Sequence, residues 1–454
     1  MNQSLCRGPI DRREFLQAGA LGIGGLTLSD LFVRRAVAGT QMKETSVILL
    51  YLHGGPSQLE TYDLKPEAPI EYRSVFGAIS TTVPGMDICD LFPRQAKIAD
   101  KIAIVRSLHH EMSSHSDGGI EVLTGKTPIK PDSTSTSKSD HPDLGSVTSK
   151  WRGISDAAVP PFVSIPNNLY MTRPTYLGLH HSGFQAGDPG GDKYVPPIGK
   201  LATGVDGNGL DDRRGLLKQL DRVRGDLDLQ GNMQGNDHFR RMAFDMLTNP
   251  NVATAFDLEK ENSDLRDKYG RNTWGQGCLL ARRLAEAGVG VITLYTNTPK
   301  NGQEYTNWDD HIGNAGRPGH FAKYMRVRLP YLDQSLATLI EDIYTRDLDR
   351  KIMVVVMGEF GRTPRLSVNS SGAGRNHWPQ AYSVLFSGGS LRVGQVVGAT
   401  NARAEYPTER PYTPKDVLAT IYRHLGINWT DAFIDHTGRP IPILPHGHAI
   451  PELI

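Results

Sequence analysis

The sequence is poor in cysteine, has no excess charge of either sign, and has no long apolar run outside its N-terminus. Its three cysteines, Cys6, Cys89 and Cys278, cannot form a disulfide framework, and none is spaced for a zinc cluster or a redox pair. The 50 Lys and Arg residues balance 49 Asp and Glu residues, so the net charge is +1 and no basic face is evident. We therefore expect no nucleic-acid partner, and no stable membrane span in the mature chain.

The length and composition favour one large domain. The chain has 454 residues, 38% of them hydrophobic, so it can bury a sizeable core. Strand and helix patterns alternate from near residue 46 to residue 425 without an obvious linker. We predict a single domain over residues 39–454, with loop insertions near 126–145 and 180–240. The 48 glycines and 29 prolines suit a site built from loops on a rigid sheet.

Residues 1–38 have the features of an export signal. Arg12 and Arg13 precede a glycine-rich apolar stretch, and residues 36–38 form a small-x-small cleavage pattern. This arrangement resembles a twin-arginine signal, although Asp11 stands where Ser or Thr is usual. We predict export by the twin-arginine machinery to the periplasm or the extracellular space, with a retained anchor as the alternative. Proteins on this route are exported folded, and many acquire a cofactor first, which is a modest indication of a metal.

Apolar runs typical of buried strands alternate with helical patterns along the chain. We predict strands at residues 46–52, 103–107, 162–166, 289–294, 352–356 and 383–386, and helices within 210–247, 253–288, 329–344 and 414–425. This order predicts an α/β fold, namely a three-layer α/β/α sandwich with a mainly parallel central sheet. The Ser/Thr-rich stretch 133–139 is predicted to be a mobile surface loop.

The segment from Met357 to Pro364 places a carboxylate and a guanidinium where a buried strand must end. It follows the run Ile352 to Val356, which includes three consecutive valines. Ligands of open α/β sheets gather outside the carboxyl ends of the strands, so Glu359 and Arg362 are candidate site residues. Glu359 could bind a metal and Arg362 a bound anion. The alternative is an Arg-Glu pair that only stabilises a loop.

Histidines and carboxylates recur at the other predicted strand ends. They are His53 after the first strand, His109, His110 and His115 after the second, Asp309, Asp310 and His311 after a third, and His377 in the loop beyond Glu359. Imidazole and carboxylate together suit zinc, manganese or iron, and two such metals about 4 Å apart can hold both oxygens of an ester displacement. An extended loop would point Asp309 and His311 the same way and Asp310 away, whereas a helical turn would reverse this. Taken singly, each histidine is equally consistent with a surface or structural role.

Several segments of the chain resemble one known family. They are HGGPSQLETYDLKP at His53–Pro66, KYGRNTWGQGCLLARRLAEAGV at Lys268–Val289, WDDH at Trp308–His311, GEFGRTP at Gly358–Pro364, GRNHWP at Gly374–Pro379 and RPYTPKDVLATIYRHLGI at Arg410–Ile427. The chain is identified as a member of the secreted, twin-arginine-exported family called domain of unknown function 1501. Similarity places this family in the alkaline phosphatase/sulfatase superfamily. The resemblance covers nearly all of the mature chain and implies an alkaline phosphatase-like fold.

The resemblance also implies a metal site. By position, His53 and Glu359 correspond to ligands of one metal, Asp309 and His311 to ligands of the other, and His377 to the last histidine. One or two divalent ions, zinc, manganese or calcium, are implied. The sequence departs from the superfamily pattern at Phe360, which cannot bind a metal, and at Asn376, where the family more often has Asp.

The resemblance places a histidine where the superfamily has its nucleophile. In sulfatases the nucleophile lies eight residues before a Leu-Thr-Gly, and here Leu123–Gly125 puts His115 at that point. His115 could attack or bind metal, or Ser113, Ser114 or Ser116 could substitute. We expect His115 and Arg362 to be the catalytic residues.

The expected function is a metal-dependent hydrolase of phosphate or sulfate esters. Small molecules or extracellular polysaccharide would be the ester substrates. The alternatives are a non-catalytic protein that binds a glycan or a protein partner on the same scaffold, and a metal-dependent lyase or transferase.

Overall fold

The computed structural model describes residues 44–153, 159–191, 194–196, 249–299, 307–312 and 319–454. The chain divides into two units, Met1–Glu44 and Thr45–Ile454, and the fold below is that of the second. The predicted export signal and the predicted helix 210–247 lie outside the described residues, as does much of the predicted insertion 180–240.

A mainly parallel eight-stranded sheet forms the centre of this unit. Its order is β15 (Gln395–Val397), β4 (Ala103–Leu108), β14 (Tyr382–Gly388), β9 (Ile352–Met357), β1 (Ser46–Tyr51), β7 (Val291–Tyr295), β5 (Phe162–Ile165) and β6 (Phe184–Gln185). Only β14 runs antiparallel to its neighbours, β4 and β9. The predicted sheet is confirmed, and each predicted strand agrees with an observed one to within about two residues.

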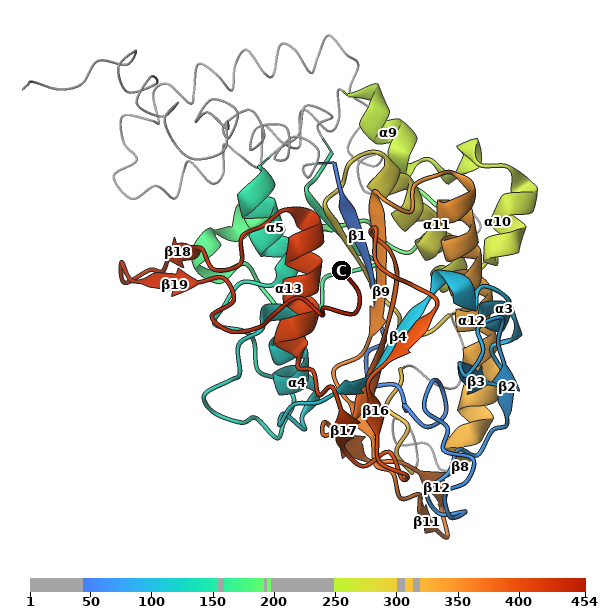
Figure 1. Cartoon of the computed structure of the whole chain (residues 1–454). Helices are drawn as coiled ribbons and strands as arrows, with labels where there is room; N and C mark the ends of the chain where they lie inside the picture. The colour runs from blue at the N-terminus through green and yellow to red at the C-terminus, as the bar shows by residue number, and fades with distance from the viewer. Residues whose placement is uncertain (1–43, 154–158, 192–193, 197–248, 300–306, 313–318) are drawn as a thin grey trace, which may run out of the picture. The chain divides into compact units, whose positions relative to one another are not determined.

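Helices cover both faces of the sheet because alternate residues of its strands are buried on opposite sides. In β1, Ile48 and Leu50 belong to one hydrophobic core, and Val47 and Leu49 to the other. The first core includes α3 (Pro93–Lys97), α9 (Pro250–Phe256), α10 (Ser263–Tyr269), α11 (Thr273–Glu286) and α12 (Phe321–Thr345). The second includes α4 (His115–Thr124), α5 (Leu144–Arg152) and α13 (Pro414–Leu425). Figure 1 shows the two helical layers on either side of the sheet, which confirms the three-layer sandwich.

Small ribbons and single turns complete the described elements. The ribbons pair β2 (Ala78–Ser80) with β3 (Asp87–Cys89), β10 (Gly361–Arg362) with β13 (His377–Trp378), β16 (Ala399–Thr400) with β17 (Pro407–Glu409), and β18 (Ala432–Ile434) with β19 (Pro440–Pro442); β12 (Gly372–Gly374) pairs with β11 (Ser367–Asn369) and β8 (Gly319–His320). Short 3-10 turns lie at Ala99–Lys101, Thr175–Leu177, Leu179–His181 and Leu258–Lys260. No described helix combines the length and apolar character needed to cross a membrane.

Two predicted helices differ from the observed ones. The stretch 253–288 is interrupted, because Asp257, Asn262 and Asn272 each cap the N-terminus of a new helix with a side-chain oxygen. The helix predicted at 329–344 begins earlier, at Phe321, and continues through Pro330. Its buried face, rather than its proline, decides its length.

Candidate metal site

The carboxyl ends of β1 and β9 bring a histidine and a glutamate together. His53 and Glu359 each lie two residues beyond their strand; His53 is 8% exposed and Glu359 is fully buried. The Oε1 atom of Glu359 accepts a hydrogen bond from the Gly54 backbone N–H at 2.8 Å and lies 3.4 Å from Nδ1 of His53. Since the two strands are paired in register up to Tyr51 and Met357, the sheet itself sets this contact.

The second carboxylate oxygen of Glu359 has no hydrogen-bond donor. Its Oε2 atom is buried and has no partner within hydrogen-bond geometry among the described residues, and the Tyr51 hydroxyl lies nearby, since burial and the charge of Glu359 raise the pKa of Tyr51. Burial alone would raise the pKa of Glu359, but the charge of His53 and the hydrogen bond from His115 lower it to about 2. Glu359 is therefore a buried carboxylate at neutral pH.

His115 begins α4 and connects the two carboxylates of the site. Its Nδ1 donates to Oε1 of Glu359 at 2.7 Å, and its Nε2 lies 3.4 Å from Oδ2 of Asp309. The Ser114 hydroxyl caps the helix by accepting from the Asp117 backbone N–H. Burial lowers the pKa of His115, but the hydrogen bonds to Asp309 and Glu359 outweigh it and raise the pKa to about 9.

Asp309 reaches the site because its loop is fixed to the turn after β1. The Trp308 backbone N–H donates to the His53 carbonyl at 2.8 Å. Gly54, at φ +113°, lies so close that a Cβ there would be 2.4 Å from the Asp309 nitrogen. Oδ1 of Asp309 lies 2.9 Å from Nε2 of His311 and 3.1 Å from Nε2 of His377. Burial would raise the pKa of Asp309, but its hydrogen bonds to the three surrounding histidines lower it well below the usual range.

The hydrogen bonds of the three histidines direct one nitrogen of each ring toward Asp309. Each Nδ1 faces an oxygen: His115 faces the Glu359 carboxylate at 2.7 Å, His311 the Asn376 amide at 2.8 Å, and His377 the Ser113 carbonyl at 2.6 Å. These oxygens accept, so each Nδ1 carries a proton and each Nε2 points toward Asp309.

A lone pair that faces a carboxylate needs a proton or a cation between them. Burial lowers the pKa of His377 more than its hydrogen bond to Asp309 raises it, so that ring is neutral at pH 7. The Nε2 atoms of His311 and His377 are also 2.9 Å apart. The donor set therefore fits a divalent metal, whose binding requires loss of the Nε2 proton of His115.

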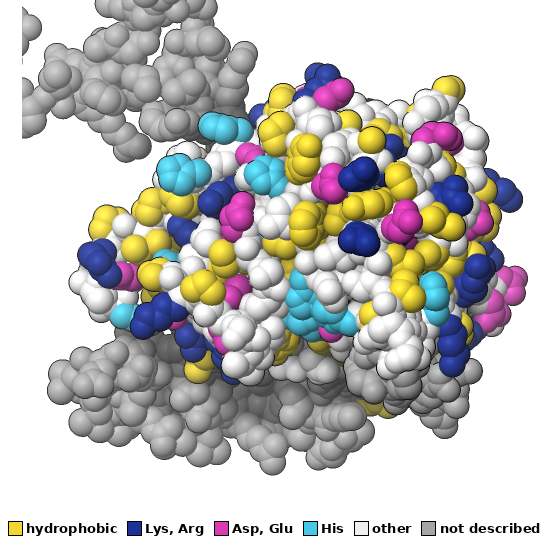
Figure 2. All heavy atoms as spheres, turned by 90° about the horizontal axis from the view of Figure 1, so that it is seen from below, with side chains coloured by type: hydrophobic (Ala, Val, Ile, Leu, Met, Phe, Trp, Pro, Cys, Tyr) yellow, Lys and Arg dark blue, Asp and Glu magenta, His cyan; other side chains and the backbone are white. Residues whose placement is uncertain are grey.

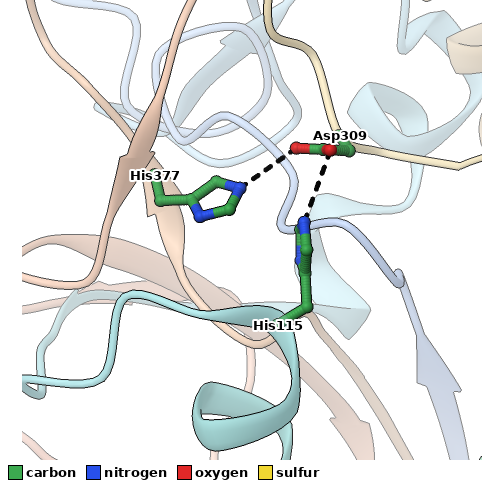
Figure 3. A group of neighbouring side chains, drawn as sticks. All are labelled: His115, Asp309 and His377. Carbon is green, nitrogen blue, oxygen red and sulfur yellow. Dashed lines mark hydrogen bonds and ion pairs between the residues drawn. The ribbon is translucent and has the colours of Figure 1, made fainter. Parts of the chain in front are cut away.

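Figure 3 shows how three of these side chains converge from separate elements. His115, Asp309 and His377 offer ligand atoms that all lie within 4.8 Å of one another. Their side chains are 15%, 21% and 20% exposed, so solvent reaches the group. On the face seen in Figure 2, histidine side chains gather near the centre beside an acidic one. His311 lies beside the cluster, while His53 and Glu359 form an adjacent pair.

The surroundings of the Arg362 side chain differ from those that the sequence predicts. We expected its guanidinium to face a bound anion, but the side chain is fully buried. Its donors are used by Oδ1 of Asp309 at 2.6 Å and by the carbonyls of Gly54, Gly55, Trp308 and Arg375. Arg362 therefore positions the Asp309 loop and does not project toward solvent.

The other polar residues near the strand ends have structural contacts. Asp310 turns away from the site and pairs with buried Arg328 at 2.5 Å, which is the extended-loop alternative. His110 donates from Nε2 to the Glu359 carbonyl at 2.6 Å, and burial lowers its pKa to about 4. Phe360, in a ligand's place by resemblance, packs its ring 4.4 Å from that of His377.

Sequence reasoning missed the residues at the margin of the site. The loop at residues 133–139 is held by hydrogen bonds, since the Asp132 carboxylate accepts from the backbone N–H groups of Thr134, Thr136 and Ser137. Ser135 then accepts from the His115 backbone N–H at 3.2 Å. An Asp before a Ser/Thr run is a turn pattern that could have indicated this. Two tyrosines beside His53 were also missed.

The family comparison covers nearly all of the unit described above. The model of the family described as "Protein of unknown function (DUF1501)" matches residues 44–454. No curated protein matches the chain.

Solved structures similar to the chain are distant in sequence. PsFucS1 sulfatase from Pseudoalteromonas sp. is 11% identical with a TM-score of 0.39, over 88% of this chain and 71% of that one. The lipoteichoic acid synthase LtaP from Listeria monocytogenes is 9% identical with a TM-score of 0.38, over 87% and 78%. The phosphonate monoester hydrolase SpPMH from Silicibacter pomeroyi is 10% identical with a TM-score of 0.33, over 90% and 76%.

Proposed function

The chain belongs to the DUF1501 family, and we propose that it is a metal-dependent hydrolase of phosphate or sulfate esters. One observation supports the proposal most. The Nε2 atoms of His115, His311 and His377 all turn toward Asp309 while each Nδ1 is held by an oxygen. A half-buried carboxylate among imidazole nitrogens is the donor set of a divalent transition metal, and it favours zinc or manganese over calcium.

A divalent cation in this site would polarise an ester oxygen and lower the pKa of a bound water. The protein holds the ligands for it in place. His115, Asp309 and His377 are the primary ligands in this proposal, with His311 next to them. Arg362 orients Asp309 from behind.

Glu359 positions His115 in this proposal instead of binding the metal. Its Oε1 receives the Nδ1 proton of His115 and thereby leaves Nε2 as the ligand atom. Glu359 and His53 are not among the three residues whose ligand atoms converge. The two residues were expected as ligands, and the adjacent pair that they form would become a second metal position only if a further ligand joined it.

With a divalent cation held by His115, Asp309 and His377, water rather than a side chain would supply the nucleophile. The ring of His115 is engaged at both nitrogens, which favours a ligand role over attack on the substrate. Ser116 is fully buried, and the Ser114 hydroxyl caps α4. Ser114 and Ser116 are thus poorly placed for a covalent ester intermediate.

The test is metal content together with ester turnover in the purified protein. We expect about one equivalent of bound metal, lost in Asp309→Asn and His377→Ala and retained in the control His446→Ala, which changes an exposed histidine. Glu359→Gln should keep the stoichiometry but weaken metal affinity about 10- to 100-fold. Turnover of an aryl phosphate or sulfate should stop on chelation and return when metal is restored.

The outcomes separate the alternatives. Metal well below one equivalent would contradict the proposal. Bound metal without turnover of any ester would favour the non-catalytic binding protein, and an unsaturated or transferred product would favour the lyase or transferase.

A further inference from the structure

Two tyrosines next to the proposed metal site have no place in the proposed chemistry. The Tyr170 ring lies 5.7 Å from the ring of His53 in an edge-to-face arrangement, and the Tyr295 ring lies 5.3 Å away. The ring of His53 is in turn 5.4 Å from that of His115. Both tyrosines are therefore next to His53, which is itself next to the proposed ligand His115.

Tyr170 is exposed and Tyr295 is half-buried, unlike the core aromatics. Tyr170 is 36% exposed, whereas Tyr51, on the inner side of His53, is fully buried. Tyr170 follows β5 and Tyr295 ends β7. These strands are paired in parallel, so both residues lie on the side of the sheet where the carboxyl ends of the strands bear the site. An exposed aromatic ring beside a site gains favourable contact area when a ligand covers it.

The carboxylates around Tyr170 disfavour a second anionic group at this position. Burial raises its pKa, and the carboxylates of Glu359, Asp132 and Asp117 raise it further, which shows that the local field is negative. Burial and Glu359 also raise the pKa of Tyr295 to about 12. Both phenols are neutral at physiological pH, with an apolar face and a hydroxyl at the end.

We propose that Tyr170 and Tyr295 bind the part of the ester that carries no charge, and that this part is a six-membered ring. The inference rests on the proposed function, because the anionic head of the ester would occupy the site of His115, Asp309 and His377. The apolar face of an aryl or pyranose ring would stack on Tyr170, with Tyr295 beside it. A quaternary ammonium group is recognised by a cage of aromatic rings, whereas two tyrosine rings next to His53 are enough to stack on one ring of a substrate.

The experiment compares Tyr170→Ala with the wild type on esters that differ in one group. The substrates are 4-nitrophenyl phosphate for an aryl ring, glucose 6-phosphate for a pyranose, ethyl phosphate for no ring and phosphocholine for an ammonium group, with the corresponding sulfates where available. For each substrate, kcat/KM of the wild type is divided by kcat/KM of the variant, so that differences in intrinsic reactivity between the substrates cancel.

We expect Tyr170→Ala to lower kcat/KM about tenfold for one or both ring esters and less than about twofold for ethyl phosphate. Tyr170→Phe should restore the ring esters. The control Trp151→Ala changes an aromatic residue that is 40% exposed in the last turn of α5, and it should change nothing. Metal content should be the same in all four proteins.

Equal losses on ring and ethyl esters, or a loss confined to phosphocholine, would overturn this inference and leave the proposed hydrolase intact. If the wild type turns over no ester, the hydrolase proposal fails, and calorimetric binding decides the inference. Tighter binding of 4-nitrophenyl phosphate than of ethyl phosphate in the wild type but not in Tyr170→Ala would support it, and equal binding would overturn it.

Discussion

Arg362 is the residue whose environment differs most from its sequence context. A guanidinium three residues after a strand-end carboxylate suggests anion binding, but here it donates to four backbone carbonyls and to Asp309. A planar fork with several fixed donors can satisfy all of these oxygens at once, and a lysine cannot. Its contribution is therefore to stability and to the position of Asp309.

We predict that Arg362→Lys lowers the free energy of unfolding of the metal-free protein by roughly 2–4 kcal/mol, because buried acceptors lose their donors. Urea unfolding measures this, with Arg365→Lys, at an exposed neighbour, as the control. A variant of unchanged stability that loses only substrate turnover would instead support the anion-binding role.

At the scale of elements, the turn after β1 holds the site together. Gly54 has φ +113°, and a Cβ there would meet backbone atoms of Trp308 and Asp309 at 2.4–2.7 Å. Backbone cannot move aside as a flexible side chain can. Gly85 also has positive φ, +79°, but nothing lies within 4 Å of its Cβ position.

These two glycines provide a matched pair. We predict that Gly54→Ala lowers stability by several kcal/mol and metal affinity at least about tenfold, because the Asp309 loop must shift, whereas Gly85→Ala costs only about 1–2 kcal/mol of backbone strain. Thermal unfolding and metal titration measure both. Similar losses in the two variants would show that the close approach to Asp309 is unimportant.

Local sequence patterns predicted the strands of the sheet well but did not predict where two of the helices begin and end. The apolar runs of β1 and β9 predict buried strands because both faces are covered. The caps at Asn262 and Asn272 were not recognised within a helical pattern, since their effect depends on where the chain turns toward the sheet. Pro330 falls inside α12 because packing on α11 offsets the lost hydrogen bond.

At the scale of the whole molecule, His424 makes stability depend on pH. It lies on α13, and its Nε2 donates to the Ser46 carbonyl at the start of β1 at 3.1 Å. Burial, together with the charge of Arg152, lowers its pKa to about 4. The unfolded chain, with a pKa near 6.5, therefore binds more protons between about pH 6.5 and 4, and stability falls as the pH falls through this window.

In that window, we predict that His424→Gln makes the free energy of unfolding less dependent on pH, by up to about 1.4 kcal/mol per pH unit. Glutamine keeps a donor for Ser46 but does not titrate. Urea unfolding at pH 7, 6 and 5 measures the slope, and His446→Gln, at an exposed position, should leave it unchanged. An identical slope in all three proteins would contradict a buried neutral His424.

The N-terminal segment leads to a prediction about location. We propose that residues 1–38 direct export through the twin-arginine route and are removed near Gly39. Replacing Arg12 and Arg13 by lysine should retain the full-length precursor in the cytoplasm. Cell fractionation and N-terminal sequencing test this, and unaffected export of the variant would exclude the twin-arginine route.

The sequence by itself determined the sheet, the layering, the family and the residue types of the site. These follow from apolar periodicity and short motifs, which are local properties of the chain. Only the tertiary structure decided which atoms meet. His115 and Glu359 are 244 residues apart, and their contact depends on strand register and helix placement together.

For the same reason, no local pattern could show that Arg362 is buried behind Asp309, or that Tyr170 stands beside His53. The direction of each imidazole depends on the oxygen that holds its Nδ1, and those oxygens belong to Glu359, Asn376 and the Ser113 backbone. The scarcity of cysteine and the balance of charge predicted no disulfide framework and no nucleic-acid partner. The chemistry proposed for the site depends on how distant loops pack at the carboxyl ends of the strands.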